Sequence, residues 1–156
     1  MNIKFYRMRA NAKLPVRAHR TDAGMDLFYC PNGTRGVSML DNGEYWLSAR
    51  SSNLVSTGLK TEIPEGYMLE IKNKSGVASK RQLIVGACVV DPGYDGEIYV
   101  NLHNIGTETQ KIRAGDKIAQ AVLVPIVHCG IEETSEDNLN QGSSRADGGF
   151  GSTGDR

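Results

Sequence analysis

Turn-forming residues interrupt this chain so often that they leave little room for long helices. Clusters rich in Gly, Pro, Asn and Asp lie at residues 31–33, 41–43, 64–66, 91–96 and 114–116. Residues of these types accept the tight or positive-φ conformations that turns require. No long amphipathic helical pattern lies between the clusters. Short strands joined by turns are therefore the expected elements.

The apolar residues between the turns follow the patterns of strands. Apolar and polar residues alternate at 69–72 and at 98–103, which is typical of half-buried strands. Residues 83–90 and 118–127 are almost continuous apolar runs, rich in Val and Ile, as in strands that are buried on both faces. In a chain this small, a symmetric partner is one way to cover both faces.

Many short strands and little helix predict an all-β fold. We expect a jelly-roll-like β-sandwich or barrel with at most one short helix, near residues 77–80. The 156 residues fit one domain, which we place at residues 1–139. Residues 140–156 contain Phe150 as their one large apolar residue and cannot hold themselves folded. They are predicted to form a flexible, Gly-rich C-terminal arm.

Composition excludes several classes of partner. Lys and Arg number 18, as do Asp and Glu, so no global field attracts nucleic acid or an anionic membrane. No apolar stretch approaches the ~20 residues that span a bilayer, and residues 1–20 lack a secretory apolar region. We expect a cytoplasmic protein, in a host cell if the source is viral. Three cysteines without CxxC spacing and three scattered histidines predict neither a disulfide framework nor a transition-metal site.

The C-terminal arm has the chemistry of a phosphate-binding segment. Its glycines leave backbone N–H groups open to an anion, Ser152 and Thr153 add hydroxyl donors, and Arg145 adds a planar fork. Phe150 could stack on a base. The arm is not the P-loop of ATPases, because GxxxxGK[ST] is absent.

Five segments resemble, in order, the five motifs of the trimeric dUTP diphosphatases (dUTPases). They are AGMDL at 23–27, KSG at 74–76, residues 86–96, GDKIAQ at 115–120 and RADGGFGSTG at 145–154. Each motif alone is weak, but five in order over residues 15–154 are specific. The resemblance implies a Mg²⁺-dependent homotrimer with active sites between subunits, in which the arm at residues 140–156 closes over the active site. It would hydrolyse dUTP to dUMP and pyrophosphate, which limits uracil incorporation into DNA and supplies dUMP for thymidylate synthesis.

The third motif carries the chemistry that the resemblance implies. Asp91 matches the carboxylate that activates water, which is otherwise a poor nucleophile toward a phosphate. Tyr94 matches the aromatic residue that packs on the deoxyribose and excludes a 2′-hydroxyl. Backbone groups near the uracil edge would reject cytosine, whose donor–acceptor pattern is reversed; they belong to Gly86, Ala87, Cys88 and Val89. Taken alone, Asp91 is more typical of a turn cap and Tyr94 of ordinary packing.

The other motifs supply the phosphate and metal contacts. The substrate-binding residues that the resemblance implies there are Lys74, Ser75, Gly76, Gln120, Arg145, Phe150, Gly151, Ser152 and Thr153. Asp26 matches the carboxylate that contacts the magnesium shell through water, and Mg²⁺ suits this work because it keeps several waters while bridging phosphates. The alternatives are a helix N-cap for Ser75, a surface strand residue for Asp26 and a core-edge hydrogen bonder for Gln120.

Three residues depart from the family pattern. Lys74 and Lys117 stand where arginine is usual, and lysine offers a point charge in place of a bidentate fork. Cys88 replaces a usual glycine beside the uracil segment, where its side chain either reshapes the site or points into the core.

Two other functions remain open from the sequence. Residues 91–94 also resemble the corresponding turn of the related dCTP deaminases. The first alternative function is therefore a dCTP deaminase, or a bifunctional dCTP deaminase and dUTP diphosphatase. The deaminases have a glutamate at the position of Asn101, and this glutamate transfers protons to and from the cytosine amino group. An amide cannot transfer these protons at neutral pH, so deamination is disfavoured. A non-catalytic nucleotide-binding regulator is the third hypothesis, with residues 32–44 as its partner surface.

Overall fold

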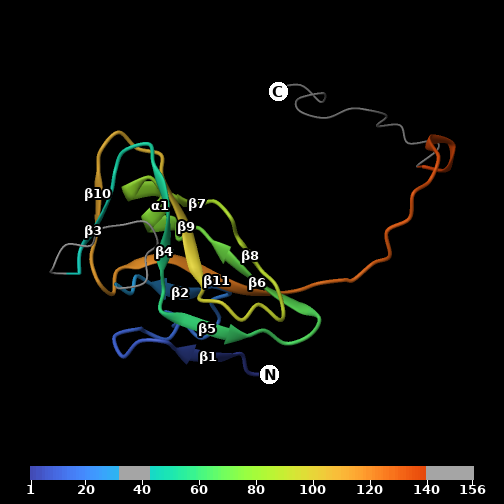
Figure 1. Ribbon diagram of the computed structural model, residues 1–156, viewed down its shortest axis with the longest axis horizontal. Coiled ribbons are helices and arrows are strands. Elements are labelled where there is room, and N and C mark those ends of the chain that lie inside the picture. Colours follow the sequence, from blue (N-terminus) through green and yellow to red (C-terminus); the bar gives the residue numbers. More distant parts are fainter. Residues whose placement is uncertain (32–42, 140–156) are drawn as a thin grey trace.

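The computed structural model describes residues 1–31 and 43–139 of the chain. Within these ranges the fold consists of short strands, one α-helix and one 3-10 turn (Figure 1). The strands are β1 (Lys4–Arg7), β2 (Met25–Phe28), β3 (Tyr45–Leu47), β4 (Ser52–Ser56), β5 (Leu59–Glu62), β6 (Tyr67–Lys72), β7 (Leu83–Val85), β8 (Val89–Val90), β9 (Tyr99–Asn104), β10 (Gln110–Ile112) and β11 (Lys117–Pro125). The helix α1 covers Ser75–Arg81 and the 3-10 turn η1 covers Glu136–Asn138.

Two antiparallel sheets form the body of the molecule. One sheet has the strand order β2-β11-β6-β8, and the other has the order β4-β9-β7. Two further pairs, β1 with β5 and β10 with β3, extend the body. This arrangement confirms the predicted all-β, jelly-roll-like sandwich, and α1 is the single short helix that was expected near residues 77–80.

The turns and the alternating strands fall where the sequence predicts them. Gly93 and Gly115 lie in predicted turns with φ of 86° and 79°, a conformation that residues with a side chain rarely adopt. In β9 the even-numbered residues are buried and the odd-numbered ones are half-buried, so one face of the strand lines the core. The largest fully buried side chains include Leu27, Leu69 and Leu102.

The apolar run at 83–90 differs from its prediction of burial on both faces. It divides into β7 and β8, which belong to different sheets. Val89 is 54% exposed, because it lies in an edge strand after the chain has crossed between the sheets. Residues 86–88 make this crossing, and it leaves their backbone accessible near the surface.

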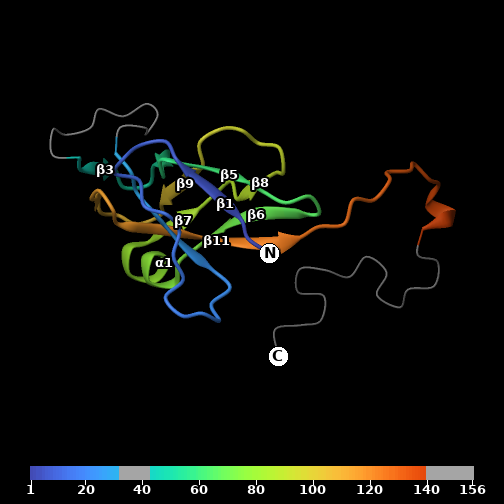
Figure 2. The same ribbon diagram turned by 90° about the horizontal axis from the view of Figure 1, so that it is seen from below.

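The chain leaves the sheets after β11. Figures 1 and 2 show this segment, in orange, running away from the body on the side opposite α1. Val127 and Ile131 are 91% and 101% exposed. None of the helices in the described ranges is long and apolar enough to cross a membrane.

Candidate active site

Strand β11 brings three of the five motifs side by side. It lies between β2 and β6, and Gln120 is opposite Asp26 on one side and Lys72 on the other. Because β6 leads directly into Lys74 and α1, the second motif begins beside Gln120. Residues more than ninety positions apart in the sequence therefore share one surface.

Asp26 is the centre of a lysine–aspartate cluster formed with Lys74 and Lys117. Its carboxylate is 4% exposed; Oδ1 lies 2.7 Å from Lys74 Nζ, and Oδ2 lies 2.7 Å from Lys117 Nζ. Burial raises the pKa of Asp26, but the two ammonium groups outweigh it and hold that pKa below its ordinary value. Two cations and one anion leave the cluster with a net charge of +1. Both lysines that depart from the family pattern thus bind the same carboxylate.

Gln120 is held in one orientation by its neighbours. Its Nε2 donates a hydrogen bond to the Asn73 carbonyl at 2.8 Å. A Cβ at Gly24 would lie 1.9 Å from Gln120 Oε1, closer than any real contact allows. The glycine of the first motif is therefore required so that Gln120 can lie against the backbone. The sequence did not reveal this role for Gly24.

Ser75 begins α1 and is not its N-cap, so the N-cap alternative for Ser75 was wrong. Lys74 occupies the cap position with extended backbone, and its side chain makes no capping hydrogen bond. The first intrahelical bond runs from Ala78 N–H to the Lys74 carbonyl. The N–H groups of Ser75, Gly76 and Val77 have no intrahelical acceptor, as at any helix start. Ser75 and Gly76 are exposed, so these donors can reach an anion.

Residues 86–89 cover the crossing between the sheets and the first residue of β8. We call them the base segment, because they were predicted to bind the uracil base. Ile71 N–H donates to the Cys88 carbonyl at 2.7 Å, which directs the backbone groups of Cys88 toward β6. Successive residues of an extended chain direct their groups to opposite sides, so those of Ala87 and Val89 point away from β6. Ala87 N–H is taken up by Asn101 Oδ1 at 3.1 Å. Among the described residues, nothing donates to the Ala87 carbonyl or accepts from the Val89 N–H, so both groups can meet a ligand.

Asn101 anchors this base segment from β9. Its carbonyl accepts from Gly86 N–H at 2.8 Å, and its Oδ1 lies 3.0 Å from His103 Nε2. A Cβ at Gly86 would lie 2.3 Å from Asn101 Oδ1 and 2.4 Å from His103 Nε2. A larger residue there would have to displace both side-chain ends, so glycine at 86 lets Asn101 and His103 lie directly against the chain. Cys88 next to them is half-buried.

Asp91 and Tyr94 lie on an exposed turn after β8. The turn closes with a hydrogen bond of 3.3 Å from Tyr94 N–H to the Asp91 carbonyl. Across residues 1–31 and 43–139, no group donates a hydrogen bond to the Asp91 carboxylate, so it does not cap the turn. Tyr94 is 48% exposed, and its hydroxyl donates to the Glu97 carbonyl at 3.0 Å. A free carboxylate and an open aromatic ring thus stand side by side.

The Asp91 turn and the lysine–aspartate cluster lie at opposite ends of β6. Val90 is opposite Leu69, so Asp91 comes level with the start of β6, whereas Lys74 follows its last residue. About six residues of extended chain, roughly 20 Å, separate the two groups. A single copy of the chain therefore does not bring Asp91 to the phosphate-binding residues.

A family model described as dUTPase matches residues 10–154. The chain belongs to the dUTPase family. A deoxyuridine 5′-triphosphate nucleotidohydrolase of Alkaliphilus metalliredigens is 40% identical over 155 residues, which cover 98% of this chain and 97% of that protein. The enzyme of the same name from Candida albicans is 34% identical over 153 residues, with 98% and 88% covered.

Solved structures of dUTPases share the fold. A mutant dUTPase of Staphylococcus bacteriophage 80alpha with bound dUpNHpp superposes with a TM-score of 0.83, at 26% identity over 98% of each chain. A mutant dUTPase from phage phi11 of S. aureus, which coordinates a structural Mg(II) ion, gives a TM-score of 0.75 at 26% identity over 87% of this chain and 98% of that one. These dUTPases have the same core as the chain described above.

The cluster fits an outer-shell contact to a metal ion. In the described part of the chain, no three His, Cys, Asp or Glu side chains converge as a protein-built metal site. Asp26 Oδ2, although ion-paired with Lys117, has no hydrogen bond of good geometry there. This oxygen is fully covered, so it can accept a hydrogen bond from a water of a magnesium shell only when the Lys117 side chain moves off it. Asp26 would hold such an ion through water and not directly.

Some predicted site residues lie outside the described ranges. The fifth-motif residues are Arg145, Phe150, Gly151, Ser152 and Thr153, all within 140–156. Most of the segment at 32–44 also falls outside. Of the remaining predicted residues, Asp26, Lys74, Ser75, Gly76 and Gln120 lie at the end of β6. The base segment with Gly86, Ala87, Cys88 and Val89 runs beside the last residues of β6, where Ile71 bonds to Cys88. Asp91 and Tyr94 lie on the turn that is level with the start of β6.

Proposed function

We propose that this chain hydrolyses dUTP to dUMP and pyrophosphate, with water activated by Asp91 attacking the α-phosphorus. The observation that carries the proposal is the exposed Asp91 carboxylate, which accepts no hydrogen bond from the described residues and follows the base segment on the same turn as Tyr94. Such a carboxylate can accept a proton from water as the bond to phosphorus forms, and pyrophosphate then leaves. The named activity of the relatives supports the same reaction.

Uracil is read by backbone atoms of the base segment. The Ala87 carbonyl accepts from uracil N3–H, and the Val89 N–H donates to a uracil carbonyl. Cytosine presents an unprotonated N3 and an amino group, which leaves both backbone groups unpaired and costs affinity. Cys88 directs its carbonyl to Ile71, so its replacement of glycine leaves these reading groups in place.

The phosphates bind at the end of β6 that lies away from the Asp91 turn. The net positive lysine–aspartate cluster attracts them, while Ser75 and Gly76 supply a hydroxyl and N–H donors that stabilise the charge building on the phosphates. Gln120, held against Asn73, presents its side chain on the same surface. When bound, Mg²⁺ would be held by Asp26 through water and would screen the charge of the phosphates. Arg145 and Phe150 of the arm close the site over the phosphate and the base.

Active sites are shared between subunits of a homotrimer. The roughly 20 Å between Asp91 and Lys74 supports this arrangement, because the sugar and the α-phosphate of one nucleotide are adjacent. Exposed Val127 and Ile131, on a segment that leaves the body (Figure 2), also favour contact with a second copy. A mass in solution near three chains is the expected result, and a monomer would contradict it.

Pyrophosphate release from each deoxynucleoside triphosphate tests the function. Turnover of dUTP should far exceed that of dCTP and dTTP, and equal rates would contradict uracil recognition. Hydrolysis in ¹⁸O-water should label dUMP; label in pyrophosphate would refute attack on the α-phosphorus. Asp91→Asn should still bind dUTP and lose several orders of magnitude in rate. Tight binding without turnover by the wild type would favour a non-catalytic regulator.

Deamination is not favoured by the surroundings of Asn101. Its Oδ1 is engaged with Ala87 N–H and lies beside His103, so this side chain anchors backbone and has no basic group to offer. Ammonia release from dCTP is the deciding assay, and no release is expected.

A further inference from the structure

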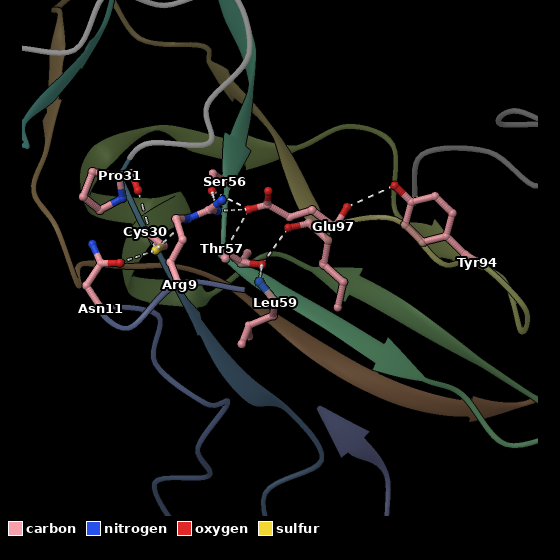
Figure 3. Close-up of polar contacts among 11 residues, drawn as sticks. Arg9, Asn11, Cys30, Pro31, Ser56, Thr57, Leu59, Tyr94 and Glu97 are labelled. Carbon is pink, nitrogen blue, oxygen red and sulfur yellow. Dashed lines mark hydrogen bonds and ion pairs between the residues drawn. The ribbon is translucent and has the colours of Figure 1, made fainter. Parts of the chain in front are cut away.

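Glu97 is a buried carboxylate that the sequence did not single out. It lies just before β9 and is 8% exposed. A buried charge is costly unless it is paired and hydrogen-bonded. Glu97 therefore needs a built environment, and Figure 3 shows that environment around its side chain.

Three donors converge on one oxygen of Glu97. Arg9 Nη2 donates to Oε1 in a close ion pair, the Ser56 hydroxyl donates at 2.5 Å, and Gly58 N–H donates at 2.7 Å. Burial raises the pKa of Glu97, but these donors outweigh it and keep the pKa below its ordinary value. The carboxylate is thus fixed as an anion that ties the N-terminal segment to the link between β4 and β5.

Gly58, one of the three donors to this oxygen, is itself closely packed. Gly58 has φ of 71°, and a Cβ there would lie 2.8 Å from both Ala12 Cβ and Cys30 Sγ. Next to it, the Thr57 hydroxyl donates to the Ile98 carbonyl at 2.6 Å, and Ile98 N–H donates to the Leu59 carbonyl at 2.8 Å. Both the side chain of Glu97 and the backbone that follows it are therefore held.

The main chain of Glu97 contacts the predicted sugar-binding residue. Its carbonyl accepts the hydroxyl hydrogen of Tyr94 at 3.0 Å (Figure 3). Tyr94 is otherwise half exposed on a turn, where two side-chain torsions would leave its ring free to swing. The hydrogen bond joins this mobile position to the buried network.

We propose that Glu97 is a positioning residue whose buried side chain fixes the carbonyl that aligns the Tyr94 ring, and that this alignment sets the preference for deoxyribose over ribose. The inference rests on the proposed role of Tyr94 as the residue that packs on the sugar. A ring excludes a 2′-hydroxyl only if it stays at contact distance from C2′. All three donors meet the single oxygen Oε1, and an amide oxygen at the same place can also accept from them. The discrimination is therefore expected to depend on side-chain length at position 97 more than on its charge.

Variants that separate length from charge test the inference. Glu97→Gln keeps the length and the accepting oxygen, whereas Glu97→Asp keeps the charge and is one methylene shorter. The measured quantity is kcat/KM for dUTP divided by kcat/KM for UTP. Glu97→Asp and Tyr94→Phe should each lower this ratio about 2- to 10-fold, the range expected for one net hydrogen bond. Glu97→Gln should keep the wild-type ratio within about twofold.

A double variant and a matched control complete the test. Glu97→Asp combined with Tyr94→Phe should lower the ratio no further than the lower single variant, because both cut the same connection. Glu62→Gln removes an exposed carboxylate that pairs with Lys4 on β1, and it should leave the ratio unchanged. An unchanged ratio in Tyr94→Phe, or full additivity in the double variant, would overturn the inference.

Tyr94→Ala distinguishes this inference from the function on which it rests. If removing the ring leaves the preference for dUTP intact, the proposed role of Tyr94 fails. If it abolishes the preference while Tyr94→Phe and Glu97→Asp keep it, only the positioning by Glu97 fails. Tyr94 is exposed, so its variants should fold, and their thermal melts should match the wild type.

Discussion

Two inactive variants of this chain should restore one another's activity, because the groups that one site needs lie at opposite ends of β6. Asp91→Asn removes the proposed base, and Ser75→Ala removes a proposed phosphate ligand; each variant alone should be at least about 100-fold slower than the wild type. If each site takes Asp91 from one chain and Ser75 from its neighbour, a site is intact only under two conditions. The chain that supplies Asp91 must be the Ser75→Ala variant, and the chain that supplies Ser75 must be the Asp91→Asn variant. Each condition holds for half the chains in an equal random mixture, so about one quarter of sites should recover.

The assay is to unfold the two variants together, refold them and measure pyrophosphate release from dUTP per chain. Different affinity tags on the two variants allow mixed assemblies to be purified first. A mixture of Asp91→Asn with the chain that carries both substitutions is the control and should stay inactive. Mixed assemblies that are no more active than the separate variants would refute a site shared between chains.

Three further outcomes follow from the structure. Folding lowers the pKa values of Asp26 and Glu97, so both carboxylates stabilise the protein at neutral pH. This contribution is lost as the pH falls below their ordinary pKa values of 3.8 and 4.5. The urea midpoint of unfolding should therefore fall on acidification, and it should fall less steeply in Asp26→Asn. Leu69→Ala, at a fully buried position in β6, should cost about 2–5 kcal/mol in the free energy of unfolding measured with urea. Truncation after Leu139 should abolish turnover and leave the thermal melt nearly unchanged; a large loss of stability would make the arm structural.

Local patterns predicted much of this fold because turns and alternation are local properties. Gly93 and Gly115 are found in turns with positive φ, and β9 alternates as its sequence predicts. The division of residues 83–90 was missed, because nothing in an apolar run shows that the chain changes sheets within it. That change depends on Asn101 and His103, which are distant in the sequence.

The candidate site could be predicted only as separate motifs. Sequence order places Asp26, Lys74 and Lys117 far apart, and the shared ion pairs arise from the pairing of β11 with β2 and β6. The network around Glu97 was missed for the same reason, since its partner Arg9 lies 88 positions away. A buried acid gives no periodic signal, so only tertiary contacts reveal it.

Lysine at positions 74 and 117 makes the charge beside Asp26 chemically removable. These side chains are 30% and 44% exposed, within reach of acyl donors. Acetylation of one amine would bring the net charge of the cluster to zero, and acetylation of both would leave an anion facing the polyphosphate. A guanidinium at either position keeps its charge under the same conditions. The choice of lysine thus exposes nucleotide binding to acyl-transfer chemistry that an arginine pair would resist.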